Sequence, residues 1–312
     1  MRKIVGIGET VLDVIFRNDQ PTAAVPGGST FNALISLGRT IPRVLPDMPV
    51  LMVTEVGDDH IGDIVVSFMK RNNVRVDAVT RHPDSQTHVS MAFLDANNDA
   101  QYEFYKDHAS AKLCPDKVSA LSFGKDDLVL FGSYFAVNPV IRDYTRQLLT
   151  DAHKAGAILY YDINFRPSHL KELPEILSSI IENCTLADFV RGSAEDFQYL
   201  FGTSDGREIY ENHIRPLCRN FILTRGAEPV EVFTEAGIRS FPVPQVETVS
   251  TIGAGDNFNA GFVYALATQD VRREGRVSLS ADALESALDI ATKFSSAACR
   301  TTFNYVGEDF AI

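Results

Sequence analysis

Apolar and polar positions follow two alternating periods along most of this chain. Short apolar runs that end in glycine or polar residues predict strands at residues 4–8, 50–55, 127–131, 157–162, 189–191 and 220–224. Segments with apolar residues at helical spacing lie between them and predict helices at residues 31–38, 61–72, 138–155, 173–183, 257–268 and 281–300. This alternation favours a doubly wound α/β fold with a mostly parallel sheet covered by helices.

Two segments interrupt the strand–helix alternation. Residues 11–26 have the pattern of a strand, a turn and a returning strand, and residues 87–107 alternate apolar and polar side chains around Asn97-Asn98. Such alternation around a turn predicts a β-hairpin. We expect one domain over residues 1–312, with these two segments forming a small β-sheet that stands off the main sheet as a lid.

Charge and cysteine content exclude several classes of protein. The formal net charge is −12, whereas binding to a nucleic-acid backbone requires a positive surface, so we expect no nucleic-acid partner. No apolar stretch approaches the ~18 residues that span a bilayer, so we expect no membrane partner. Four separated cysteines without metal-ligand spacing indicate free thiols and a cytoplasmic location.

The segment Gly253-Ala254-Gly255-Asp256 is the first candidate for chemistry. Small residues before a helix allow consecutive amides to point at one anion, and the helix N-terminus adds its partial positive charge. Asp256 at this position is suited to take a proton from an attacking hydroxyl while the loop holds a phosphate. The alternative is a glycine turn in which Asp256 only caps the helix.

A second glycine pair, Gly27-Gly28, precedes another predicted helix. Without side chains, both residues allow a ligand to approach the backbone closely. Asn32, one turn into the helix, would present its amide to the hydroxyls of a polyol. The alternative is an ordinary helix start with a structural asparagine.

The chain resembles the ribokinase-like, or PfkB, family of carbohydrate kinases, and within it the fructokinase branch. The matching residues occur in order along nearly the whole chain, at Gly8-Glu9 with Asp13, Gly27-Gly28 with Asn32, Gly57-Asp58-Asp59-x-x-Gly62, Asp162-x-Asn164-x-Arg166, Thr224-x-Gly226 and Gly253-Ala254-Gly255-Asp256. One glycine motif is weak support, but six in order form a specific pattern.

The resemblance implies a role for each matched residue. Asp256 would be the catalytic base, and Gly253, Ala254 and Gly255 would form the anion hole with Arg166 close to the transferred phosphate. Asp13, Gly27, Gly28 and Asn32 would hold the sugar, and Thr224 and Gly226 would lie along the nucleotide. The implied cofactors are ATP and Mg²⁺.

Two departures from the family pattern bear on the metal ions. Ser193 and Asp196 stand where relatives carry an Asn-x-x-Glu motif beside the nucleotide, and we expect Asp196 to reach Mg²⁺ through water. Ser250 replaces an aspartate that helps to form a monovalent-cation site in relatives, which argues against activation by K⁺.

The sequence leaves the substrate open. The expected activity is ATP-dependent phosphorylation of a sugar hydroxyl, with fructose first and 2-keto-3-deoxygluconate, ribose or a nucleoside as alternatives. A non-catalytic sugar- or nucleotide-binding regulator is a further alternative. Glu103 and Lys106 in the lid are candidates for substrate contact, and the exposed lid sheet suggests a homodimer. The mixed charges of residues 272–276 predict a solvated loop.

Overall fold

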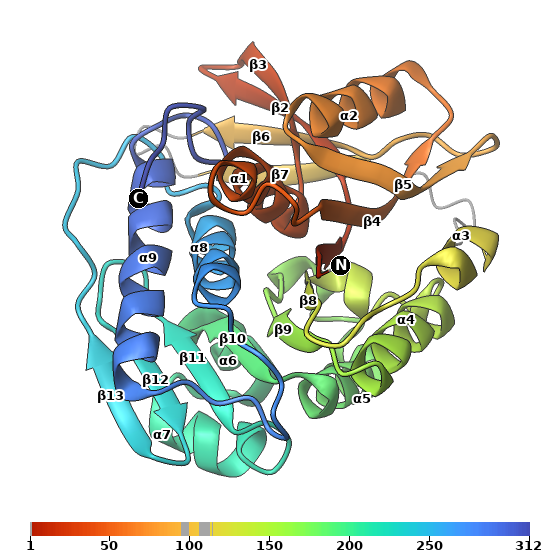
Figure 1. Cartoon of the computed structure of the whole chain (residues 1–312). Helices are drawn as coiled ribbons and strands as arrows, with labels where there is room; N and C mark the ends of the chain where they lie inside the picture. Colours follow the sequence, from red (N-terminus) through yellow and green to blue (C-terminus); the bar gives the residue numbers. More distant parts are fainter. Residues whose placement is uncertain (1, 95–99, 106–112, 114) are drawn as a thin grey trace.

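In the computed structural model, which describes the chain apart from residues 1, 95–99, 106–112 and 114, the main feature is a nine-stranded sheet (Figure 1). Its strands are β1 (Ile4–Ile7), β4 (Val50–Gly57), β5 (Val74–His82), β8 (Leu128–Gly132), β9 (Ile158–Asp162), β10 (Phe189–Ser193), β11 (Asn220–Thr224), β12 (Val230–Thr234) and β13 (Gly237–Phe241). They lie in the order β13-β12-β11-β10-β9-β8-β1-β4-β5. The strands from β11 to β5 pair in parallel, and only β12 and β13 are antiparallel.

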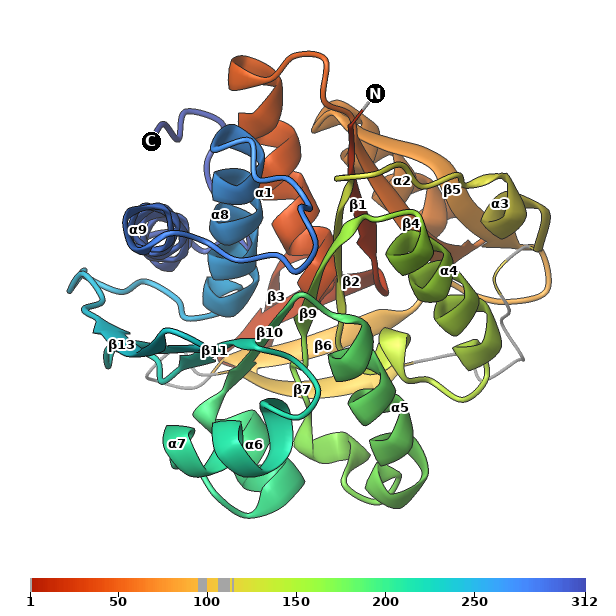
Figure 2. The same ribbon diagram turned by 60° about the horizontal axis from the view of Figure 1, so that its bottom comes forward.

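Helices cover both faces of this sheet. They are α1 (Ser29–Val44), α2 (His60–Arg71), α3 (Pro115–Ala120), α4 (Arg142–Lys154), α5 (Leu173–Leu186), α6 (Ala194–Phe201), α7 (Gly206–Ile209), α8 (Ala254–Thr268) and α9 (Ala281–Cys299). Figure 2 shows α1, α8 and α9 on one face and α4, α5 and α6 on the other. Each face therefore has its own hydrophobic core.

The strands alternate their side chains between the two cores. Leu128 and Leu130 of β8 face the core under α8, whereas Val129 and Phe131 face the opposite core. This period of two is what extended backbone imposes. Because both faces are covered, the strands read as continuous apolar runs.

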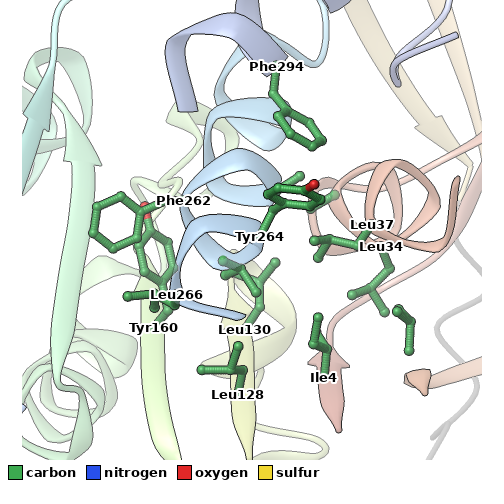
Figure 3. Close-up of a cluster of buried hydrophobic side chains, with 14 of the residues drawn as sticks. Ile4, Leu34, Leu37, Leu128, Leu130, Tyr160, Phe262, Tyr264, Leu266 and Phe294 are labelled. Atoms are coloured by element: carbon green, nitrogen blue, oxygen red, sulfur yellow. The ribbon is translucent and has the colours of Figure 1, made fainter. Parts of the chain in front are cut away.

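Helix α8 is deeply buried, and its N-terminus carries the Gly253-Ala254-Gly255-Asp256 motif. It packs between α1 and α9, and its residues from Asn257 to Ala267 are buried on every side. Figure 3 shows Phe262, Tyr264 and Leu266 of this helix among side chains of the sheet and the neighbouring helices. Burial of this kind fixes the position of the N-terminus of α8 relative to the strands.

A second sheet of four strands is formed by the two segments that interrupt the alternation. Strands β2 (Val11–Arg17), β3 (Gln20–Gly27), β6 (Val89–Leu94) and β7 (Ala100–Tyr105) lie in the order β3-β2-β6-β7. A two-residue turn at Asn18 and Asp19, both at positive φ, joins β2 to β3. The hairpins predicted at residues 11–26 and 87–107 are confirmed in their described residues.

The predicted strands and helices of the main domain are all present, but several elements were missed. These are β5, β12 and β13, the short helices α3, α6 and α7, and three single-turn segments at Tyr134–Ala136, Pro167–His169 and Tyr210–Ile214. Among the described residues, no helix combines the length and the apolar character needed to cross a bilayer.

The prediction of a solvated loop at residues 272–276 is wrong for Arg273. Its guanidinium donates to the carbonyl of Ala157 at 2.7 Å and forms an ion pair with Asp188, while its amide donates to Asp126 Oδ1 at 2.6 Å. These partners precede β9, β10 and β8. Arg273 therefore ties together the amino ends of three strands, at the edge of the sheet away from their carboxyl ends.

Candidate active site

The carboxyl ends of the parallel strands carry the predicted nucleotide-side residues Ser193 and Thr224. Strand β1 lies between β4 and β8, so the chain runs outward from β1 in both directions. In open α/β sheets, ligands bind beside the carboxyl ends of the strands at such a reversal of order. Asp162 ends β9, Ser193 ends β10 and Thr224 ends β11, so these residues lie along this edge.

The N-terminus of α8 forms the centre of the site. Gly253 caps the helix at φ 78°, and a Cβ at this position would lie 2.6 Å from the carbonyl oxygen of Asn304. The side chain of Asn257 holds the turn by donating to the carbonyls of Gly253 and Asn304 at 2.8 and 2.9 Å. The amide of Ala254 closes the turn onto Thr251 at 3.2 Å, and Gly255 and Asp256 follow within the first helical turn, whose amides have no partner inside a helix.

Asp256 is the third residue of α8, so it is not the N-cap that the alternative interpretation required. Ser29 Oγ donates to its Oδ1 at 2.7 Å, and Asn32 Nδ2 donates to its Oδ2 at 2.8 Å. Burial raises the pKa of Asp256, while the bonds from Asn32 and Ser29 and the charge of Arg166 oppose the rise. The carboxylate is thus oriented on both oxygens and made more basic, which suits proton abstraction.

The start of α1 brings the second glycine motif to the same place. Gly28 has φ 119°, and a Cβ there would lie 2.4 Å from the carbonyl oxygen of Glu9. The predicted role of Asn32 is consistent with its geometry, because its Oδ1 is buried and has no hydrogen-bond partner among the described residues. An unpaired buried acceptor is costly unless a ligand supplies a donor, and a sugar hydroxyl would be such a donor.

Asp13 is buried between the small sheet and the C-terminal segment. Ser90 Oγ of β6 donates to its Oδ1, and Asn304 Nδ2 donates to its Oδ2 at 3.3 Å. Burial raises the pKa of Asp13 to about 6, the bond from Ser90 opposes this, and the charge of Asp256 adds to it. The effect of the Asp256 charge on Asp13 indicates that the two carboxylates lie near each other. A Cβ on Gly27 would lie 2.2 Å from Asp13 Oδ2, so glycine keeps this carboxylate accessible from the backbone side.

The other side of the site contains a buried polar network that the sequence did not predict. Arg191 Nη1 donates to Asp162 Oδ1 at 3.0 Å, and its Nη2 donates to Thr224 Oγ1 at 2.6 Å. Asn259 Nδ2 of α8 donates to Asp162 Oδ2 at 2.7 Å. The hydroxyl of Thr224 is thus engaged with Arg191 at the carboxyl end of β11, and its contact with a nucleotide stays a prediction. Gly226 follows at φ 62°, and a Cβ there would meet no atom within 4 Å.

Ser193 and Asp196 form a capping box at the start of α6. The amide of Ser193 donates to Asp196 Oδ2 at 2.6 Å, and the amide of Asp196 donates to Ser193 Oγ at 3.1 Å. Burial raises the pKa of Asp196 to about 6, with a further contribution from the charge of Asp162. Among the described residues, no group of three or more potential ligands surrounds a metal position. Because Mg²⁺ with a nucleotide needs only one or two carboxylates beside the phosphates, the metal role of Asp196 stays a prediction.

Arg166 and Asn164 follow β9 on the way to the next single-turn segment. Arg166 is exposed, and its charge partly opposes the rise that burial causes in the pKa of Asp256, so it lies near that carboxylate. Asn164 has φ 40°, and its buried Nδ2 has no partner within the described structure. Both residues thus have donors available for an anionic ligand.

Of the two lid residues proposed for substrate contact, the structure describes only Glu103, and it lies on the face of the small sheet opposite Asp13. Asp13 pairs with Ser90, and Val14 pairs with Met91, which in turn lies opposite Glu103. Paired residues share a face of a sheet and neighbours alternate, so the exposed Glu103 belongs to the face opposite Asp13. Lys106 lies outside the described residues. Among the described lid residues, Ser90 donates to Asp13, and sequence reasoning missed this contact.

Comparisons with known proteins identify the family to which this chain belongs. The model of the pfkB family carbohydrate kinases matches residues 1–303. The chain belongs to the pfkB family of carbohydrate kinases. A fructokinase from Rhizobium leguminosarum bv. trifolii is 26% identical over 301 residues, which cover 92% of this chain and 86% of that protein. An aminoimidazole riboside kinase from Salmonella typhimurium is 24% identical, over 85% of this chain and 81% of that protein.

Solved structures with the same fold include two nucleotide complexes. The fructokinase from Vibrio cholerae O395 bound to fructose, ADP and calcium superposes with a TM-score of 0.83 at 21% identity, covering 97% of this chain and 94% of that one. The Salmonella enterica aminoimidazole riboside kinase bound to its riboside and an ATP analogue gives 0.82 at 22% identity, covering 99% and 97%. This pfkB member therefore has the ribokinase-like fold, and as a member of the family it is a phosphotransferase that acts on a sugar hydroxyl.

Proposed function

We propose that this protein transfers the γ-phosphate of ATP to a hydroxyl of a sugar, with fructose as the first substrate candidate. The observation that carries the proposal is the position of Asp256, held on both oxygens at the N-terminus of α8 beside an anion-binding turn. The relatives named above include a fructokinase and a riboside kinase, so a riboside is the second candidate.

Each side of the site would perform one part of the reaction. Asp13 and the free Oδ1 of Asn32 would hold sugar hydroxyls, which places the reacting hydroxyl at Asp256. Asp256 would accept the proton of that hydroxyl as it attacks. ATP with its Mg²⁺ supplies the phosphoryl group and neutralises part of the charge on it.

The amides of the first turn of α8 would receive the negative charge that spreads over the phosphoryl oxygens. Arg166 would add a cation close to the transferred phosphoryl group, and the small sheet would close over the sugar to exclude water. Whether potassium activates the enzyme depends on Ser250, which stands where relatives have an aspartate. Its Oγ accepts a hydrogen bond from the amide of Ile252 at 3.2 Å. A hydroxyl at this position lacks the negative charge that favours a monovalent cation, so we expect equal rates with and without potassium. Homodimer formation through the small sheet also stays a prediction.

The decisive experiment measures ADP release with ATP and Mg²⁺ across fructose, other sugars and ribosides. We expect Asp256→Asn to lower kcat about 10²- to 10⁴-fold, the range for loss of a general base. Asp289→Asn, on the exposed face of α9, is the matched control and should keep the wild-type rate. If no sugar or riboside stimulates ADP formation, the proposed function is wrong. A near-wild-type rate for Asp256→Asn would reject only the assignment of the base.

A further inference from the structure

The buried arginine of β10 lies directly beneath the anion-binding turn. Arg191 is 7% exposed, and its two donated bonds reach Asp162 in β9 and Thr224 in β11. Its third nitrogen, Nε, is buried and has no hydrogen-bond partner among the described residues. The guanidinium thus spans three strands at their carboxyl ends.

The contact between Arg191 and α8 explains the second glycine of the turn. A Cβ on Gly255 would lie 3.0 Å from Arg191 Nη2 and 3.2 Å from Nη1. The guanidinium carbon also lies 5.9 Å from the ring centre of Phe258, one turn further along the helix. The cation therefore packs closely against the first turn of α8, and a side chain at Gly255 would fit only if the guanidinium shifted by a few tenths of an ångström.

Taken alone, the position of the Arg191 cation beside the N-terminus of α8 is electrostatically unfavourable for the fold. A helix N-terminus carries a partial positive charge, so a cation beside it is repelled. Asp162 pairs with the guanidinium, and the charges of Asp162 and Asp196 raise the pKa of Arg191 against the effect of burial. A buried ion pair can often be replaced by neutral residues without loss of stability. Stability therefore does not account for a positive charge at this place, whereas an anion above Gly255 would.

We infer that Arg191 is a positioning residue of phosphoryl transfer, whose fixed charge beneath Gly255 strengthens the anion hole for the terminal phosphate of a nucleoside triphosphate. The inference rests on the proposed function. Arg191 acts through the amide of Gly255 and does not itself touch the phosphate. Asp162 and Asn259 complete the arrangement by fixing α8 to the strand that carries the charge.

The test compares a charged with a neutral replacement. Arg191→Lys keeps the charge, Arg191→Gln removes it, and the pair Asp162→Asn with Arg191→Gln leaves a neutral hydrogen-bonded couple. We expect kcat to fall about 10- to 100-fold in Arg191→Gln and in the double variant, somewhat less than the loss of a whole oxyanion donor. Arg191→Lys should stay within about fivefold of wild type, because a point charge lacks only the fork geometry. The KM for the sugar should not change in any of them.

Two readouts separate this role from a structural one. Thermal unfolding should show the double variant close to wild type, and binding of a non-hydrolysable ATP analogue should weaken relative to ADP only in the neutral variants. Arg75→Gln, in an exposed pair, is the matched control. If the stable double variant regains wild-type kcat, or if Arg191→Gln equals Arg191→Lys in both rate and analogue binding, the inference is overturned.

The same set of variants distinguishes failure of the Arg191 inference from failure of the proposed function. If wild type forms no ADP with any acceptor, the kinase proposal fails. The ratio of analogue to ADP affinity in wild type and in Arg191→Gln then decides the Arg191 inference alone. An unchanged ratio would overturn it.

Discussion

Ser29 offers a direct test of how the environment sets the basicity of Asp256. Its hydroxyl donates to Asp256 Oδ1 at 2.7 Å, and this bond favours the ionised carboxylate. Ser29→Ala removes the donor and leaves the bond from Asn32 in place. Burial already raises the pKa of Asp256, so losing an opposing bond must raise it further.

The size of the effect follows from the strength of the bond. Hydrogen bonds to charged groups contribute about 1.5–3 kcal/mol, and Ser29 is only partly buried, so water would replace part of the loss. The low end of that range corresponds to about one pKa unit. Because the ionised form is the active base, the acid limb of kcat/KM should move to higher pH by about one unit, with little change above it.

The assay is the pH profile of kcat/KM for the sugar, measured at saturating ATP. Below the limb, Ser29→Ala should be about tenfold slower than wild type, and Ser29→Thr, which keeps a hydroxyl, should restore the wild-type limb. An acid limb of Ser29→Ala that coincides with wild type would refute the reasoning. A uniform loss at every pH would instead indicate that Ser29 positions the base without tuning it.

Three further substitutions test other parts of the structure. Asp13→Asn should stabilise the fold at pH 7 by up to about 3 kcal/mol while weakening sugar binding. The pKa of Asp13 in the folded protein, about 6, lies above its usual value, so the wild type loses stability as the pH rises from about 4 to about 6. Unfolding curves of both proteins at the two pH values check this. Gly253→Ala should lower kcat at least about 100-fold, because a Cβ would meet the carbonyl of Asn304 at 2.6 Å and the positive φ would be strained; intact ADP binding with a normal rate would contradict this. Arg273→Met should cost about 3 kcal/mol in denaturant unfolding by leaving Asp188 unpaired, with kcat unchanged because the contact lies at the amino ends of the strands.

Sequence periodicity predicted the main sheet because its strands are buried on both faces. Short apolar runs such as those of β8 and β9, with predicted helices before and after them, indicate buried parallel strands. Strands β12 and β13 escaped because they are antiparallel at the edge of the sheet, and every residue of β13 from Gly237 to Ser240 is exposed. Their pattern lacks the apolar run that identifies the buried strands.

The glycine and aspartate motifs predicted the centre of the site, but its supporting residues were missed. Gly253, Gly28 and Asp256 have local signals, because positive φ or a helix start demands them. Ser90 and Asn304 meet Asp13 from distant parts of the chain, and only the folded structure joins them. Arg191 did carry a signal, since a charged residue inside a buried strand is rarely placed there without a partner.

The central position of β1 has a consequence for synthesis on the ribosome. On one side of β1 lies β4, which follows early in the chain. On the other side Ile4 pairs with Leu128 of β8, and the amide of Lys3 donates to Asp127, which follows 124 residues later in the chain. At translation rates of about 5–20 residues per second, this edge of β1 stays open for about 6–25 s. An unpaired, wholly apolar strand edge is prone to wrong pairing during that time. Slower elongation before residue 128 should therefore increase aggregation of the nascent protein, whereas slower elongation after β8 should not.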